Sequence, residues 1–214
     1  MNTTIIIIKK VTLIPASFVG STFGIRLAAD DLSWGIRTLT LSGGGVQVNW
    51  GDGTNEESAG GERVMHTYAR AGEYAVRVSD GVKELSAVGG DADFNAAHAH
   101  KLIRFATNGR ELTTLNVLSF KNCVNLASVG FAGSGLATVG RQAFAYCTGL
   151  RGRIDFPGLT SFPTGTFAPL KGCTGGITEI HFPVAMAETF GQSDGFLTDP
   201  TLGTGTARTI FDLP

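Results

Sequence analysis

The sequence predicts a mainly β fold, with a small N-terminal β-sandwich over residues 1–85 packed on a short, capped C-terminal solenoid over residues 86–214. Two observations lead to this prediction. Short stretches of alternating apolar and polar residues, separated by turn residues, fill the N-terminal part and are typical of a sandwich. One apolar pattern occurs three times in the C-terminal part, at a spacing typical of a solenoid. The 30 glycines against 7 prolines fit the many tight turns that both architectures need.

Composition and charge limit the possible functions. Hydrophobic residues make up 43% of the chain and charged residues only 16%, so the chain can bury a core. The net charge of −1 leaves no basic surplus to neutralise phosphates, and we expect no nucleic-acid partner. Lys9 and Lys10 follow the apolar run Ile5–Ile8, whereas a secretory signal places its positive charges first. The stretch Val11–Ala29 is too interrupted to span a membrane, so we expect no direct membrane insertion.

Alternating apolar residues predict the strands of the N-terminal part in order. The expected strands are Thr3–Lys9, Phe23–Leu27, Ile36–Leu41, Val46–Trp50, Val64–Tyr68 and Tyr74–Val78. Turns are expected at Asp30–Asp31, Gly51–Thr54 and Asp80–Gly81, because Asp and Gly accept the backbone conformations of tight turns. Residues 55–62 are polar and predict a loop.

Three pieces of this part carry a resemblance to a known family. They are Val46–Thr54 (VQVNWGDGT), His66–Tyr68 (HTY) and Gly72–Val78 (GEYAVRV), in this order along the chain. Together they resemble the signature of the polycystic-kidney-disease (PKD) type domain. The resemblance implies an immunoglobulin-like sandwich that serves as a spacer or a binding module and not as an enzyme.

The residues of these pieces have expected structural roles that agree with the resemblance. Trp50 should fill the core of the sandwich, and Asp52 should cap the turn that follows it. His66 and Tyr68 should lie on the strand after the loop and fix its return.

Residues 83–110 join the two parts. Phe94–Ile103 predicts a short helix, and Leu102, Ile103 and Phe105 lead into the repeats. We place the boundary near residue 85. The linker is short and is not rich in Ser or Pro, which favours two parts that pack together over two parts that move freely.

The C-terminal part repeats one apolar pattern. In each copy an apolar residue precedes a Phe by eight positions, and a Cys follows that Phe by three, three and six positions. The copies are Leu112, Leu115, Phe120, Cys123, Leu126, Phe131; Leu136, Val139, Phe144, Cys147, Leu150, Phe156; and Leu159, Phe162, Phe167, Cys173, Ile177, Phe182. One copy is too small to bury its own apolar face, so the copies are expected to stack. The matching positions of the three Cys predict a buried ladder of free thiols.

These copies resemble the BspA-type leucine-rich repeat of bacterial surface proteins. The segment Gln142–Leu150 (QAFAYCTGL) is the closest match, and Asn122–Phe131 and Ile177–Pro183 match the strand pieces of that repeat. The third copy departs from the pattern, because Pro169–Gly172 is inserted before Cys173. A PKD-like sandwich before such repeats is an arrangement of bacterial surface proteins and of proteins carried by their prophages.

The tail is expected to close the open end of the repeats, where unpaired backbone and apolar groups would otherwise meet water. Ala185–Phe190 predicts a helical turn, the segment 191–206 is rich in Gly, Thr and Asp, and Thr209–Leu213 predicts a last strand.

Two groups of residues are candidate metal ligands. His98 and His100 form a possible pair beside Asp91 and Asp93, but no further ligand stands at a recognisable spacing. Four turn residues could gather at one end of the sandwich and bind calcium, although turn capping is the commoner role: Asp30, Asp31, Asp52 and Asp80. We therefore predict no cofactor and keep calcium as the one possible ion.

The pattern favours binding over catalysis. No nucleophile stands beside a base, and Gly133–Gly135 lacks the Gly-x-Ser-x-Gly pattern of a nucleophile elbow. The solvent-facing residues that we expect to contact a ligand are Arg153, Asp155, Glu179 and His181. We expect a non-enzymatic adhesion protein, extracellular or at the cell surface, that recognises a host or matrix protein or glycan. The alternative is a phage or prophage tail or fibre part in a phage particle, and a third hypothesis is a glycoside hydrolase whose acidic pair meets only in the fold.

Overall fold

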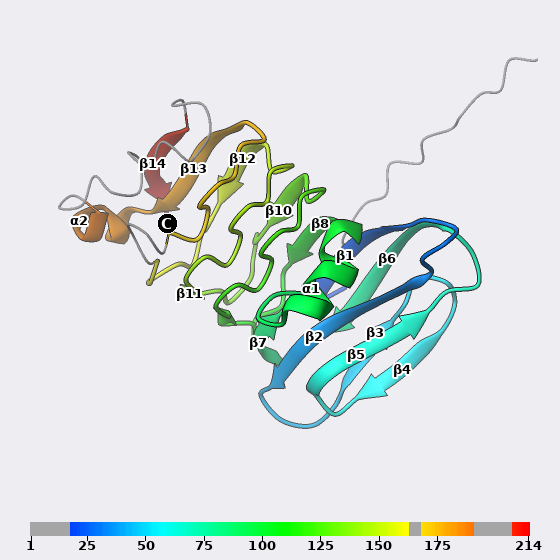
Figure 1. Cartoon of the computed structure of the whole chain (residues 1–214). Coiled ribbons are helices and arrows are strands. Elements are labelled where there is room, and N and C mark those ends of the chain that lie inside the picture. The colour runs from blue at the N-terminus through cyan, green and yellow to red at the C-terminus, as the bar shows by residue number, and fades with distance from the viewer. Residues whose placement is uncertain (1–17, 163–167, 191–206) are drawn as a thin grey trace, which may run out of the picture.

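The computed structural model describes residues 18–162, 168–190 and 207–214, which form a mainly β fold (Figure 1). The strands are β1 (Gly20–Leu27), β2 (Ser33–Leu41), β3 (Val46–Asn49), β4 (Asn55–Ser58), β5 (Gly61–Thr67), β6 (Gly72–Ser79), β7 (Val82–Ser86), β8 (Leu102–Thr107), β9 (Thr114–Leu115), β10 (Ser128–Gly130), β11 (Thr138–Val139), β12 (Gly152–Asp155), β13 (Ile177–Pro183) and β14 (Arg208–Leu213). The helical elements are α1 (Ala92–His98), η1 (Ala99–Lys101), η3 (Val184–Met186) and α2 (Ala187–Phe190). The predicted strand Thr3–Lys9, the repeat residue Phe167 and the segment 191–206 lie outside the described residues.

Two sheets face each other at the N-terminal end. One has the strand order β10-β8-β1-β6-β3-β4, and the other has the order β11-β9-β7-β2-β5. Phe23 of β1 meets Trp34 of β2 between the sheets, with ring centroids 5.5 Å apart, and both side chains are fully buried. The alternation of apolar residues along these strands therefore marks the faces that form the core.

Both sheets continue across residue 85, where the sequence places the boundary. β1 pairs with β8, and β8 pairs in parallel with β10 of the first repeat copy. In the other sheet β7 pairs in parallel with β9, which pairs with β11. Figure 1 shows α1 beside this junction. The strands of the repeats thus extend the sheets of the N-terminal part.

The repeat copies lie against one another in register. The backbone N–H of Phe120 donates to the carbonyl of Ala143 in the next copy at 2.6 Å, and Phe144 N–H donates to Pro169 at 2.8 Å. Equivalent residues of the three copies, Asn122, Tyr146 and Gly172, all have a positive φ, near 63°, 61° and 72°. All of the described residues of the apolar pattern are at most 6% exposed. The repeated pattern therefore supplies one shared core.

A row of phenylalanine rings runs through this core from the first sheet toward the C-terminus. Phe131 lies between Phe105 and Phe156, at centroid distances of 6.1 and 5.1 Å. Phe182 continues the row at 5.7 Å from Phe156, and Phe211 ends it at 5.9 Å from Phe182. Rings at these separations add to the stabilisation from burial alone.

The three cysteines are buried free thiols, which confirms the predicted ladder. The Cys147 thiol donates to the carbonyl of Phe120 at 3.0 Å, and the Cys173 thiol donates to Phe144 at 3.1 Å. Burial raises the pKa of both thiols, so neither is an activated nucleophile.

One local prediction was wrong, and another was displaced along the chain. Residues 55–62, expected as a loop, contain β4 and the start of β5. β4 is an edge strand, and its Glu56 and Glu57 are exposed to solvent. The sequence of this strand is therefore as polar as that of a loop. The helix expected over Phe94–Ile103 is present two positions earlier, as α1 and η1. Asp91 caps α1 by accepting from the Phe94 N–H at 3.0 Å, and Leu102 and Ile103 already belong to β8.

A third sheet, in the order β12-β13-β14, ends the described chain. β14 pairs in parallel with β13, as Ile180 opposite Thr209 and Phe182 opposite Phe211 show. The predicted last strand is thus present. The helical turn expected over Ala185–Phe190 is also present, as η3 and α2.

Candidate functional site

The four residues predicted to contact a ligand lie together on the outer face of the third sheet. β12 and β13 run in parallel, with Arg153 opposite Glu179 and Asp155 opposite His181. Ile154 and Ile180, which alternate with them, point into the core and are at most 2% exposed. The strand period of two therefore puts all four polar side chains on the same face.

A fifth residue, Asp212 of β14, joins this group, which we call the outer-face cluster (Arg153, Asp155, Glu179, His181 and Asp212). Arg153 Nε donates to Asp155 Oδ1 at 2.5 Å. The His181 ring lies between two carboxylates, with Nδ1 2.7 Å from Asp212 Oδ1 and Nε2 3.2 Å from Glu179 Oε2. The expectation that His181 faces solvent was wrong, because these neighbours leave its residue only 3% exposed.

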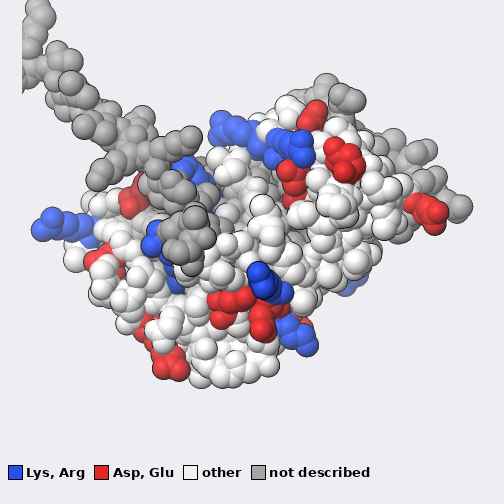
Figure 2. All heavy atoms as spheres, turned by 180° about the vertical axis from the view of Figure 1, so that it is seen from behind, with Lys and Arg blue, Asp and Glu red and all other residues white. Residues whose placement is uncertain are grey.

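The cluster has a mixed charge. Side chains of Arg153, Asp155 and Asp212 are 48%, 44% and 49% exposed, so they remain accessible to a partner. Figure 2 shows acidic and basic side chains intermixed on the side of the molecule opposite to the view in Figure 1. Such a surface can favour one orientation of a bound partner, because in other orientations like charges of the two proteins would face and repel each other.

This geometry favours the imidazolium form of His181. A neutral imidazole has only one N–H, so both ring nitrogens can donate to carboxylates only when the ring is protonated. Burial lowers the pKa of His181, but its hydrogen bonds to Asp212 and Glu179 raise it, and the net pKa lies above the ordinary value of 6.5. The proton on His181 therefore helps to hold β14 against β13.

We expect the stability that His181 contributes to depend on pH. A pKa raised by folding adds stability that is complete below the ordinary pKa of about 6.5 and is lost as the pH rises through the folded-state pKa. Denaturant unfolding of the wild type and of His181→Gln over a pH series measures the effect, and the wild type should lose stability relative to the variant as the pH rises. Asp212→Asn should weaken the same dependence. Identical pH profiles for the wild type and His181→Gln would show that the imidazolium pair is not stabilising.

Trp50, Asp52 and His66 occupy the structural positions expected for them, and Tyr68 lies directly after β5. Trp50 is 1% exposed, and its ring stacks on His66 at 4.9 Å. Asp52 caps the turn by accepting from the N–H and the hydroxyl of Thr54 at 3.0 and 2.6 Å, and it meets His66 Nε2 at 2.7 Å. Burial by itself raises the pKa of Asp52, but these hydrogen bonds lower it by more, so that the net pKa is about 2. The Tyr68 hydroxyl donates to the Trp50 carbonyl at 3.1 Å. Trp50, Asp52, His66 and Tyr68 together therefore act as a brace between the ends of β3 and β5.

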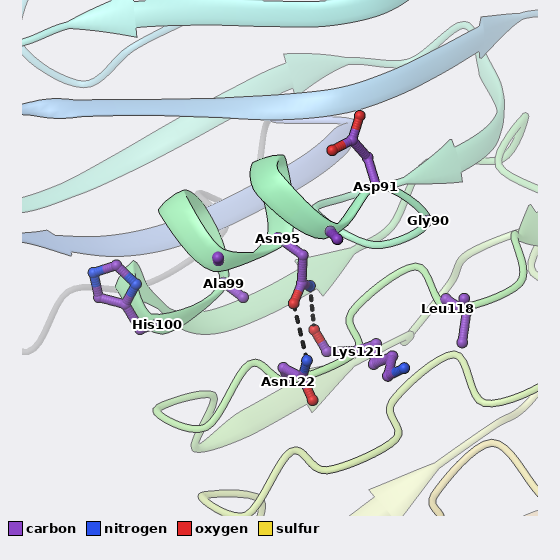
Figure 3. Close-up of a pocket in the computed structure, with 10 residues that line it drawn as sticks. Gly90, Asp91, Asn95, Ala99, His100, Leu118, Lys121 and Asn122 are labelled. Carbon is purple, nitrogen blue, oxygen red and sulfur yellow. Dashed lines mark hydrogen bonds between the residues drawn. The ribbon is translucent and has the colours of Figure 1, made fainter.

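A hollow lies at the junction of the N-terminal sheets and the first repeat copy (Figure 3). Its volume is about 520 Å³, and α1 forms one wall while the turn from Leu118 to Asn122 forms the other. Asn95 projects from α1 toward the turn and donates to the Lys121 carbonyl at 2.5 Å, and the Asn122 amide donates back to Asn95 Oδ1 at 3.0 Å. This hollow could not be predicted from the sequence, because its walls come from segments that meet only in the fold.

The predicted His pair does not meet at a metal site. His98 and His100 lie at the end of α1 and in η1, not on one strand, so the ring of His98 is buried against Phe94 at 4.4 Å while His100 is exposed. Burial, and then the nearby Lys101, lower the pKa of His98 to about 4, so the buried ring is neutral. Asp91 is occupied as a helix cap and as the partner of Arg63 at 2.9 Å.

Three of the four Asp predicted as possible calcium ligands have separate partners. Asp31 pairs with the buried Lys101 at 2.6 Å, Asp52 pairs with His66, and Asp80 accepts from the N–H groups of Arg110 and Glu111. Asp30 lies in the turn beside Asp31. Within the described ranges, no three His, Cys, Asp or Glu side chains are grouped so that they could hold a metal ion.

Comparisons of this chain with protein-family models, with curated proteins and with solved structures find no match. None of the helices in the described part of the chain is long and apolar enough to cross a membrane.

Proposed function

We propose that this chain is a non-catalytic binding protein of the cell surface or the extracellular space, in which a PKD-like β-sandwich carries a BspA-type leucine-rich-repeat solenoid. The stacked copies, their shared row of phenylalanines and the buried thiols support a solenoid built from the repeated pattern. The brace around Trp50 and His66 supports the PKD-like sandwich. In this arrangement the rigid core presents side chains of the outer strand face to a protein or glycan partner.

The outer-face cluster carries this proposal. Four residues selected from the sequence as ligand contacts lie on one face of two paired strands, although 28 positions of the chain separate Arg153 from His181. Their charges are mixed and are paired with one another, as in Arg153 with Asp155 and His181 with Asp212. Paired and partly exposed charges on a rigid sheet favour orientation and selectivity of binding.

A binding screen of the purified full chain on host glycans and extracellular-matrix proteins tests the proposal. The full chain is required because both sheets continue across residue 85, and deletion of residues 86–214 would open the core. We expect at least one specific ligand, and we expect Asp155→Asn with Glu179→Gln to weaken its binding by about tenfold or more.

The matched control is Glu56→Gln with Glu57→Gln, which removes the same charge from the exposed edge strand β4. It should leave binding unchanged. If no ligand binds, the adhesion proposal fails and a structural part of a phage or prophage particle becomes the better hypothesis. If both double variants weaken binding equally, the ligand recognises total charge and not the outer-face cluster.

A further inference from the structure

Three adjoining hollows form one groove along the junction. The hollow of Figure 3 shares His100 with a second hollow of about 230 Å³. The second shares Arg26, Ile103 and Asn125 with a third, of about 220 Å³, which ends at Arg151. We call these three hollows together the junction groove. Because neighbouring hollows share lining residues, an extended ligand could contact more than one of them.

The charges that line the junction groove are unbalanced. The acidic residues already have cationic partners, since Asp91 pairs with Arg63 at 2.9 Å and Asp31 pairs with Lys101 at 2.6 Å. Three lining cations, Lys121, Arg104 and Arg151, have no carboxylate partner among the described residues. Arg151 makes only a hydrogen bond from Nε to the Gly149 carbonyl, at 3.2 Å. The groove therefore offers unneutralised positive charge to an anion.

The other lining groups are polar amides, small side chains and a few aliphatic side chains, and no aromatic residue is among them: the aliphatic ones are Leu27, Ile103, Leu118 and Val124. Asn122 and Asn125 use their side-chain N–H groups within the chain, at Asn95 Oδ1 and the His100 carbonyl, so their Oδ1 atoms remain as acceptors. The helical wall is formed largely by Ala92 and Ala96 of α1 and by Ala99 of η1, which leave room above the helix and provide no large apolar anchor. A peptide partner usually gains affinity from buried aromatic or aliphatic anchors, whereas hydroxyl groups match acceptors and cations.

We propose that the junction groove binds an acidic glycan, whose carboxylates or sulfates contact Lys121, Arg104 and Arg151 and whose hydroxyl groups donate to Asn122 and Asn125. This inference goes beyond the outer-face cluster, because it assigns a second surface and a ligand class. The two surfaces adjoin, since Arg151 at the end of the groove stands two positions before Arg153 of the cluster. One chain of an acidic polysaccharide would be long enough to follow the groove.

The test is the affinity of the full chain for two probes, a sulfated heparin oligosaccharide and a carboxylated hyaluronan oligosaccharide, with neutral dextran as the blank. We expect at least one acidic probe to bind, with affinity that falls as salt screens the charges. The variant Lys121→Gln, Arg104→Gln, Arg151→Gln should weaken binding by about tenfold or more. The charge-matched control Arg70→Gln, Lys83→Gln, Arg110→Gln, which changes exposed residues outside the groove, should keep wild-type affinity.

The outcomes separate this proposal from the proposed function. Preference for heparin or for hyaluronan identifies sulfate or carboxylate as the recognised group. Asp155→Asn with Glu179→Gln should leave binding of the acidic probe intact, because it removes only negative charge from the cluster. The groove proposal is overturned if neither probe binds, if poly-glutamate or single-stranded DNA binds as well as the glycans, or if the control triple variant loses as much affinity as the groove variant. None of these results decides whether the outer-face cluster binds its own ligand.

Discussion

Replacement of Phe131 by Ala is expected to lower the free energy of unfolding by about 3–5 kcal/mol. Phe131 is 1% exposed and lies between Phe105 of β8 and Phe156 of the next copy, and it also meets Phe144 at 6.4 Å. Its removal leaves a cavity at the point where the N-terminal sheets pass into the repeats, and Phe105 cannot move into that cavity without disturbing the pairing of β8 with β1 and β10.

The loss should spread over both parts of the chain. Both tryptophans, Trp34 and Trp50, lie in the N-terminal sheets, and all three cysteines lie in the repeats. Tryptophan fluorescence and thiol labelling during denaturant unfolding therefore report on the two parts separately. Because the sheets continue from β7 to β9 and from β8 to β10, we expect the two transitions to coincide and to shift together in Phe131→Ala.

Two further variants keep this prediction testable. Phe131→Leu should fold even if the alanine variant does not, and it should show a smaller shift of both probes. Tyr146→Ala removes an aromatic ring that is 43% exposed, so it should cost about 1 kcal/mol or less. If the thiols become reactive at a lower denaturant concentration than the tryptophans respond, the parts unfold independently in spite of their shared sheets.

Local pattern predicted the strands β1, β2, β3, β5 and β6 and the apolar core of the repeats, because both depend on spacing within a few residues or on a fixed period. The positions of Cys123 and Cys147 indicated a ladder before any pairing was known, since residues one period apart must meet when copies stack. The edge strand β4 was missed for the opposite reason. Glu56 and Glu57 sit where one face of the strand meets water, so polar composition there carries no information on backbone conformation.

The candidate sites, too, could be predicted only where they depend on local spacing or on the repeat period. Arg153, Asp155, Glu179 and His181 could be grouped from the sequence because their strands fall at equivalent places in consecutive copies. Asp212 could not, since its strand returns only after the segment 191–206 and the sequence does not say beside which strand it pairs. The burial of His181 follows from that pairing and was missed with it.

Asn95 is expected to cap the first repeat copy. Between consecutive copies a backbone N–H of one copy donates to a carbonyl of the next. Asn122 N–H donates to the Ala145 carbonyl at 2.8 Å, and Tyr146 N–H donates to the Lys171 carbonyl at 2.7 Å. The equivalent carbonyl of the first copy belongs to Lys121, and no copy precedes it. The side-chain amide of Asn95 takes the place of the missing backbone donor at 2.5 Å, and the same amide also donates to Val88 at 3.3 Å.

We expect Asn95→Leu to lower the free energy of unfolding by about 2–4 kcal/mol. The substitution leaves the carbonyls of Val88 and Lys121 and the side-chain amide of Asn122 without their partner. The control is Asn122→Gly, which removes the exposed partner but suits the positive φ of 63° at this position, so it should cost about 0.5 kcal/mol. Hydrogen exchange should accelerate at the amides of Phe120 and Asn122 in Asn95→Leu, and much less at those of Phe144 and Tyr146. Equal acceleration in both copies would mean that Asn95 stabilises the fold as a whole and does not cap the first copy.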